Sequence, residues 1–291
     1  MIDSYRVLYL RSNRGFLKLF WCDGRRNIHS IQNKLHGDDN LLNPPISRMG
    51  GKSKLRKTII SMIPEHTCYV EPFFGAGWVF FGKEPSKVEV INDIDKELIN
   101  MFKMMKYHEP EITRLMQYEI CSRDEFDEYA KADVNSMTDV QRAIRFIYVS
   151  SQSFASKGNH FGYGTTGRPS PRIFCTEHLK CIKERLRNVY IENLSFEKIF
   201  EKYDRPHCFF YCDPPYYETA GYNNKFGEKE HLLLRDLLKD MQGKFLLTIN
   251  DHPEVREWYK DFNLKEVKVN YSVSREQKAR EKYNELIITN Y

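Results

Sequence analysis

Residues 68–93 read CYVEPFFGAGWVFFGKEPSKVEVIND, and this stretch decides the fold class. The apolar run at 68–71 predicts a strand, the proline and glycines at 72–77 a turn, and the apolar residues at 78–82 the start of a helix. A second strand is expected at 87–91, and a helix at 94–106, where apolar residues recur at helical spacing. This strand–turn–helix–strand–helix order is typical of the opening of a parallel α/β sheet.

The strand–helix alternation continues on either side of this stretch and is interrupted once. Upstream, a helix is expected at 55–63. Between 107 and 187 the alternation stops: helices are expected at 112–120, 124–131, 140–151 and 177–187, with a loop rich in Gly, Ser and aromatic residues at 156–172. The alternation then resumes with strands at 189–192, 207–212 and 245–249 and helices at 196–202, 228–241 and 253–259.

The end of the chain predicts a different kind of strand pairing. Two final strands, at 265–271 and 285–289, have no helix between them and are expected to form an antiparallel hairpin. The predicted fold class is therefore α/β, with a Rossmann-like sheet domain of residues 44–106 and 188–291 and an inserted, mainly helical segment at 107–187. Residues 1–43 show no sustained helical or strand period and are interpreted as an extension.

Composition excludes several classes of protein. The 291 residues include 45 Lys+Arg and 40 Asp+Glu, a formal net charge of +5 that is compatible with a polyanionic partner without requiring one. No stretch approaches about 18 uncharged apolar residues, so no membrane span is expected. The seven cysteines are irregularly spaced and form no CxxC pair, which argues against a disulfide framework and a structural zinc site. Buried reduced thiols, a cytoplasmic location and no metal are expected.

The first motif is the turn from Glu71 to Gly77, EPFFGAG, between a strand and a helix. Its glycines let the backbone approach a ligand closely. Asp93 follows the second strand, 18 residues after Gly75, which is the usual offset for a carboxylate that binds a ribose diol. A tight turn without a ligand is equally compatible with this motif alone.

The second motif is Asp213-Pro-Pro-Tyr216, directly after the strand at 207–212. In open parallel sheets, ligands bind at the carboxyl ends of the strands. Pro214 and Pro215 stiffen the turn and remove two backbone donors, so the Asp213 carboxylate and the carbonyls remain as acceptors beside the flat face of Tyr216. This arrangement suits a planar group that carries an amino donor, although a proline turn that only caps a core strand is the structural alternative.

The third motif, Arg48-Met-Gly-Gly-Lys52, opens a basic stretch. Residues 44–60 contain five cations and no acid, which favours contact with an anion or a carboxylate. The phosphate-binding pattern GxxxxGK[ST] is absent. A solvated basic helix explains this stretch as well as a binding site does.

In this order the motifs resemble the Dam-like, alpha-class adenine-specific DNA methyltransferases. The resemblance covers residues 44–291 and consists of Gly50-Gly51-Lys52, the turn Glu71–Gly77, Asn92-Asp93-Ile94, an inserted segment and then Asp213–Tyr216 with Thr219, followed by NELIITN at 284–290. It implies a class I S-adenosylmethionine-dependent methyltransferase sheet. One position departs from the pattern, because Arg48 stands where the family often has an aromatic residue.

The resemblance also implies a cofactor and a reaction. S-adenosylmethionine would be the methyl donor, and the exocyclic N6 amine of a flipped adenine in a specific double-stranded DNA sequence the target. Phe73, Gly75 and Gly77 would line the cofactor pocket. Asp93 would accept hydrogen bonds from the ribose hydroxyls, and Lys52 would approach the methionine carboxylate end. Arg48 is a further candidate for cofactor binding. Asp213 would lie between cofactor and base, Asp213 and the Pro214 carbonyl would accept the amine protons, and Tyr216 would stack on the base, with Pro215 completing the catalytic motif.

DNA contacts are expected in the inserted segment, where aromatic residues lie among cations, and in the final hairpin loop, whose cations could clamp phosphates. The candidates are Lys157, His160, Phe161, Tyr163, Arg168, Arg172, Arg275 and Lys278. A surface loop whose aromatics pack on its own helices is the alternative for the inserted segment, and a plain solvated turn for the hairpin.

The partners and the competing functions follow from the same reading. We expect double-stranded DNA, no membrane, a monomer or weak dimer, a bacterial or phage setting and a restriction endonuclease encoded nearby. A methyltransferase acting on structured RNA and a non-enzymatic DNA-binding regulator are the alternative functions. A nicotinamide-linked dehydrogenase is disfavoured because GxGxxG is absent and Asp213–Tyr216 has no role in it.

Overall fold

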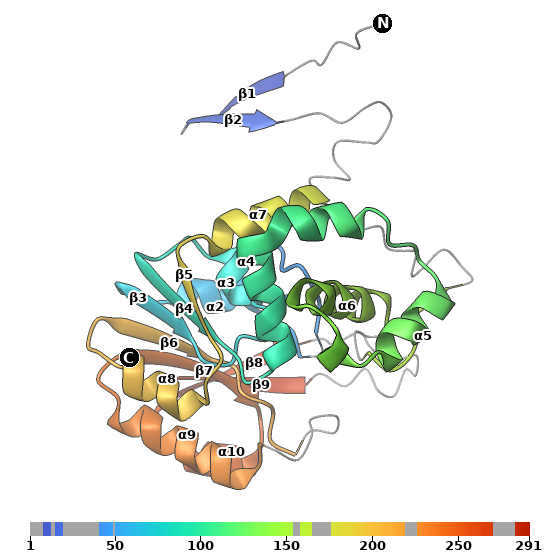
Figure 1. Ribbon diagram of the computed structural model, residues 1–291. Coiled ribbons are helices and arrows are strands. Elements are labelled where there is room, and N and C mark those ends of the chain that lie inside the picture. Colours follow the sequence, from blue (N-terminus) through green and yellow to red (C-terminus); the bar gives the residue numbers. More distant parts are fainter. Residues whose placement is uncertain are drawn as a thin grey trace, which may run out of the picture.

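A computed structural model describes residues 8–12, 15–19, 41–48, 50–153, 158–164, 176–218, 226–269 and 283–291. Seven strands form one sheet in the order β5-β4-β3-β6-β7-β9-β8 (Figure 1). They are β3 (Cys68–Glu71), β4 (Val88–Asn92), β5 (Val189–Glu192), β6 (Cys208–Cys212), β7 (Lys244–Asn250), β8 (Asn263–Val269) and β9 (Tyr283–Thr289). The first five in chain order pair in parallel, and β9 is antiparallel to both β7 and β8.

The strand order confirms the predicted fold class. The chain runs outward from β3 to β4 and β5, then returns to the other side of β3 with β6 and β7. Such a reversal between β3 and β6 is the point at which open α/β sheets bind ligands. The antiparallel hairpin predicted at the end of the chain is confirmed for β8 and β9, but β9 lies between β7 and β8 instead of at the edge.

Helices cover both faces of the sheet (Figure 1). One core layer lies under α2 (Arg56–Met62), α3 (Trp78–Gly82), α4 (Lys96–Met116), α6 (Asp139–Gln152) and α7 (Thr176–Leu186). The other lies under α8 (Phe196–Tyr203), α9 (Glu228–Asp240) and α10 (Pro253–Trp258). A short helix α5 (Arg123–Lys131) and a 3-10 turn (Val134–Ser136) connect α4 to α6.

Strand periodicity explains the two core layers. Successive strand side chains point to opposite faces, so on β6 Phe209 and Tyr211 join the first layer while Phe210 joins the second. All five β6 residues are buried. The sequence therefore appears as a continuous apolar run, which is typical of a parallel strand covered on both sides.

One helix differs from the sequence prediction. Separate helices were expected at 94–106 and 112–120, but α4 runs from Lys96 to Met116 across a kink at His108 and ends four residues early. Pro110 lies inside α4 and cannot donate the helical hydrogen bond, which accounts for the kink. The predicted boundary of the inserted segment at residue 107 therefore falls within a helix, and apolar residues of α6 and α7 join the same core layer as the sheet.

Residues 1–43, interpreted from the sequence as an extension without a sustained period, include a two-stranded antiparallel sheet of β1 (Leu8–Ser12) and β2 (Gly15–Leu19). One further expectation needs correction. Among the described cysteines, Cys68, Cys208 and Cys212 are buried as expected, but Cys121 is exposed. None of the helices in the described residues has the length and apolar character needed to cross a membrane.

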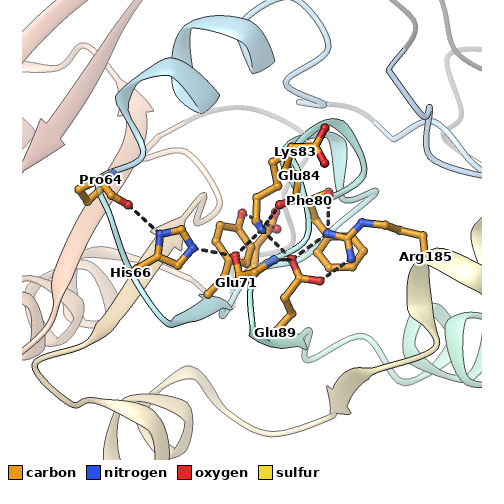
Figure 2. A network of polar contacts seen from close by, with 10 residues as sticks. Pro64, His66, Glu71, Phe80, Lys83, Glu84, Glu89 and Arg185 are labelled. Carbon is orange, nitrogen blue, oxygen red and sulfur yellow. Dashed lines mark hydrogen bonds and ion pairs between the residues drawn. The ribbon is translucent and has the colours of Figure 1, made fainter. Parts of the chain in front are cut away.

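A buried charged network ties α7 to the sheet (Figure 2). Glu89 on β4 accepts from Lys83 Nζ at 2.6 Å and from Arg185 Nη2 of α7 at 2.8 Å, and all three side chains are at most 9% exposed. Burial raises the pKa of Glu89, but the bonds and charges of Arg185 and Lys83 outweigh it and hold that pKa below its usual value. The carboxylate therefore stays ionised and anchors the last helix of the inserted segment.

Candidate active site

A cleft of about 550 Å³ opens where the strand order reverses. This volume lies within the usual range of about 300–1,000 Å³ for small-molecule sites. Its walls come from the segments that follow β3, β4, β5 and β6, together with Arg48 and residues 50–52. Four strand ends thus converge on one cavity, as the parallel sheet predicts.

The glycine turn after β3 forms one wall of the cleft. Gly75 and Gly77 have φ values of +52° and +77°, which a side chain would strain. A Cβ on Gly77 would lie 2.5 Å from the Phe74 ring, whereas a Cβ on Gly75 would meet nothing within 4 Å. Gly77 is therefore needed for packing, and Gly75 keeps space open in the cleft.

Asp93 joins this turn to the end of β4. Its Oδ2 accepts from the Gly75 amide and its Oδ1 from the Asp95 amide, both at 2.9 Å. Burial raises the pKa of Asp93, and these two amide hydrogen bonds oppose that rise. Because a carboxylate oxygen can accept more than one hydrogen bond, Asp93 keeps acceptor capacity toward the cleft.

Asp213 marks the opposite side of the cleft, just beyond β6. Its Oδ1 is 2.7 Å from Lys52 Nζ and accepts from the Thr248 hydroxyl at 2.9 Å. Burial raises the pKa of Asp213, whereas the Lys52 charge and its hydrogen bond lower it. Oδ2 receives no hydrogen bond from any residue that the structure describes, so it is the oxygen available to a ligand.

Lys52 lies on the Asp213 side of the cleft. It is 3% exposed, and its Nζ lies 4.7 Å from the centre of the Tyr216 ring and donates to the Gly50 carbonyl. Arg48 lies on the other side, where it forms a 3.0 Å ion pair with Asp95, the N-cap of α4. The basic motif thus reaches both walls of the cleft.

Glu71, the first residue of the glycine turn, is buried, accepts from the Tyr69 hydroxyl at 2.9 Å, and has its pKa raised by burial. The structure also brings in residues that the sequence analysis did not single out. Thr248 and Asn250, at the end of β7, contact the Asp213–Tyr217 segment. Phe196, Phe226 and Glu230 are further additions to the lining. Strand-end position could have suggested Thr248 and Asn250, but only the sheet register shows their partners.

The candidate DNA contacts fall into two groups. His160 and Tyr163 are exposed, and Phe161 is half-buried against Phe126 with ring centres 5.7 Å apart. Arg123 lies within about 5 Å of both the Phe161 and Tyr163 rings. The other candidates lie outside the described residues: Lys157, Arg168, Arg172, Arg275 and Lys278.

The two walls of the cleft have different chemistry. The β3–β4 wall offers open space at Gly75 and a carboxylate at Asp93, which fits a nucleoside ligand. The β6 wall offers acceptors and an aromatic face, which fits an amine on a planar ring. Two such walls are what the sequence resemblance predicts for the class of S-adenosylmethionine-dependent amino-methyltransferases.

Known proteins define the family. A family model described as D12 class N6 adenine-specific DNA methyltransferase matches residues 49–273. The chain is 31% identical to the Type II methyltransferase M1.LlaDCHI of Lactococcus lactis subsp. cremoris, over 86% of this chain and 96% of that protein. It is 28% identical to the DNA adenine methylase of Haemophilus influenzae, over 84% and 92% of the two chains, and 26% identical to that of Escherichia coli K12, over 82% and 91%.

The chain therefore belongs to the D12 class N6 adenine-specific DNA methyltransferases. Its reaction is methylation of adenine N6 in DNA, with S-adenosylmethionine as cofactor. The family resemblance, the fold class, the enzyme class and the cofactor predicted from the sequence are confirmed.

Proposed function

We propose that the protein methylates an adenine flipped out of a specific duplex DNA sequence, and that Asp213, Pro214, Pro215 and Tyr216 form the site for that base. One observation carries the proposal. The Asp213 carboxylate stands at a strand end in the cleft, with Oδ1 held by Lys52 and Thr248 and with Oδ2 facing no described donor.

The opposite wall would hold the cofactor. Phe73, Gly75 and Gly77 line the cleft, and the open space at Gly75 leaves room for a ligand. Asp93 would accept from the ribose hydroxyls with its remaining lone pairs. Arg48 would approach the methionine end from its position beside Asp95. When bound, S-adenosylmethionine supplies an electrophilic methyl group.

The base side would prepare the amine for transfer. An adenine amine is a poor nucleophile because its lone pair is delocalised into the ring. Asp213 Oδ2 and the Pro214 carbonyl would accept its two protons in hydrogen bonds and so direct the lone pair toward the methyl carbon. Lys52 would keep Asp213 ionised, and Tyr216 would stack on the ring. Positioning and fixed charges supply most of the rate enhancement in such a site.

Access to the base requires DNA distortion. The amine in a paired duplex cannot reach the end of β6, so the base has to leave the stack at a cost of about a few kcal/mol. The exposed pair His160 and Tyr163 would contact DNA, with Phe161 supporting them from its half-buried position. We extend the same role to Lys157, Arg168, Arg172, Arg275 and Lys278 as a hypothesis from the sequence.

Asp213→Ala tests the proposal. We expect loss of N6-methyladenine formation from labelled S-adenosylmethionine on amplified, unmethylated duplex DNA, with cofactor binding retained. Asp213→Asn tests the charge, because it keeps the shape. Asp236→Ala is the matched control, since Asp236 pairs with Arg235 on the surface of α9. Wild-type methylation by Asp213→Ala would refute the role of Asp213 in the base site. Faster methylation of structured RNA than of duplex DNA would refute duplex DNA as the substrate.

A restriction-modification setting is favoured by one finding. The Lactococcus relative is named a Type II methyltransferase. We infer that this protein protects a specific sequence against an endonuclease encoded nearby. Mapping N6-methyladenine in DNA from cells that express the chain tests this inference: methylation of every copy of one short sequence is expected, and methylation without sequence preference would contradict it.

A further inference from the structure

We propose that Thr248 and Asn250 on β7 are positioning residues that hold the two ends of the Asp213–Tyr217 segment for methyl transfer. The inference rests on the proposed role of Asp213. It assigns the reaction geometry to a strand that carries no residue of the catalytic motif.

Thr248 fixes the carboxylate. It is fully buried, and its hydroxyl donates to Asp213 Oδ1 at 2.9 Å. The Tyr211 hydroxyl lies 3.2 Å from the Thr248 oxygen. Because an ionised carboxylate only accepts, the Thr248 proton points to Asp213 and Tyr211 must donate to Thr248. The resulting chain of hydroxyls leaves a single orientation for Oδ1 and hence for Oδ2.

Asn250 fixes the backbone at the other end. Its Oδ1 accepts from the Tyr217 amide and its Nδ2 donates to the Tyr217 carbonyl, both at 3.0 Å. The β6–β7 ladder stops at Cys212 opposite Leu247, and neither Pro214 nor Pro215 can donate to extend it. The Asn250 side chain therefore replaces the missing ladder and places Tyr216, the preceding residue.

The sheet register explains why the two residues act together. Thr248 and Asn250 are two positions apart on one strand and face the same side. The antiparallel partner β9 sets Ile287 opposite Thr248 and Glu285 opposite Asn250. Both residues therefore lie in the β7–β9 ladder, just beyond the point where pairing with β6 stops at Leu247, and this ladder makes them rigid supports for the loop.

Loss of the Thr248 hydroxyl and loss of the Asn250 side chain should affect the pH dependence of kcat/KM differently. The charged and titratable groups facing Asp213 are Lys52, Glu71 on β3, Tyr211 on β6 and Glu285 on β9. The Thr248 hydrogen bond favours ionised Asp213. Removing it should move the acid limb of the kcat/KM profile to higher pH. Asn250 acts on a backbone, so its removal should lower kcat without moving that limb.

Thr248→Val and Asn250→Ala test the proposal in the full-length enzyme. We expect kcat on duplex DNA to fall about 10- to 100-fold in each, as for loss of a hydrogen bond that orients a charged or reacting group. Cofactor Kd and the melting temperature should change little. Thr248→Ser should restore both kcat and the acid limb. Asn263→Ala is the matched control, because Asn263 makes one exposed hydrogen bond to the Tyr291 carbonyl.

The results separate this inference from the proposed function. Wild-type kcat in Thr248→Val or Asn250→Ala, with Asp213→Ala inactive, would overturn the positioning role of Thr248 and Asn250 and leave the proposed function unaffected. Activity of Asp213→Ala would overturn the proposed function. If Thr248→Val does not fold, Thr248→Ala removes the same hydroxyl by deletion. An unchanged acid limb in the folded Thr248 variant would refute the role assigned to the hydroxyl.

Discussion

Replacing Lys52 with methionine tests the electrostatics of the cleft. Lys52 Nζ and Asp213 Oδ1 are 2.7 Å apart, with side chains 3% and 21% exposed. Two opposite unit charges about 4 Å apart attract by about 4 kcal/mol at an effective dielectric constant of about 20. This attraction favours the ionised carboxylate, so loss of the ammonium should raise the pKa of Asp213 further.

The direction of the pH effect follows from the role of Asp213. The carboxylate accepts hydrogen bonds from the amine only when it is ionised, and burial already raises its pKa. In Lys52→Met the acid limb of kcat/KM should therefore move to higher pH. Activity should fall about tenfold or more near the lower end of the wild-type range and recover toward pH 9.

The assay is transfer of labelled methyl groups to unmethylated duplex DNA from pH 5 to 9, with cofactor Kd measured at each pH. Lys54→Met is the matched control, because Lys54 is exposed two residues away and reports loss of a cation in the same segment. A profile for Lys52→Met that superimposes on the wild-type profile would refute the reasoning. Weaker cofactor binding at every pH, with the acid limb at its wild-type position, would show that Lys52 contributes to cofactor binding and does not keep Asp213 ionised.

Three further outcomes follow from other parts of the molecule. Glu89→Gln leaves Lys83 and Arg185 buried without their shared ion-pair partner and should lower the free energy of unfolding by about 3–5 kcal/mol in urea titrations; no measurable loss would contradict the network. Buried His231 has its pKa lowered to about 4 by burial, so stability present above about pH 6.5 should be lost as pH falls toward 4, by about 3 kcal/mol, and His231→Phe should flatten that slope; an unchanged slope would show that other groups cause it. Gly75→Ala places a methyl group in the cleft at φ +52°, so it should cost about 1–2 kcal/mol of stability and weaken cofactor binding measured by calorimetry; wild-type affinity would remove Gly75 from the cofactor wall.

Local signals account for the elements that sequence analysis predicted well. The strand at 68–71 matches β3, because its apolar run is bounded by turn residues on both sides. The strand at 189–192 matches β5 for the same reason. Both end in segments that line the cleft, so the position of the cofactor motif could also be predicted.

Nonlocal pairing accounts for the features that the sequence could not supply. The position of β9 between β7 and β8 depends on a ladder with β7, which no pattern within β9 encodes. The contacts of Asp213 with Thr248 and of Tyr217 with Asn250 span 35 and 33 residues. Neither Thr248 nor Asn250 belongs to a recognisable motif, because a positioning residue is defined by what it contacts in space.

The two cations of the basic motif lie on different sides of the cleft. The sequence analysis predicts Lys52 at the methionine end of the cofactor and Arg48 among the cofactor-binding residues. In the structure, Arg48 pairs with Asp95 beyond β4, whereas Lys52 pairs with Asp213 beyond β6. Arg48 and Lys52 are four positions apart in the sequence, yet they contact the supports of both walls, because the ends of β4 and β6 meet at one edge of the folded sheet.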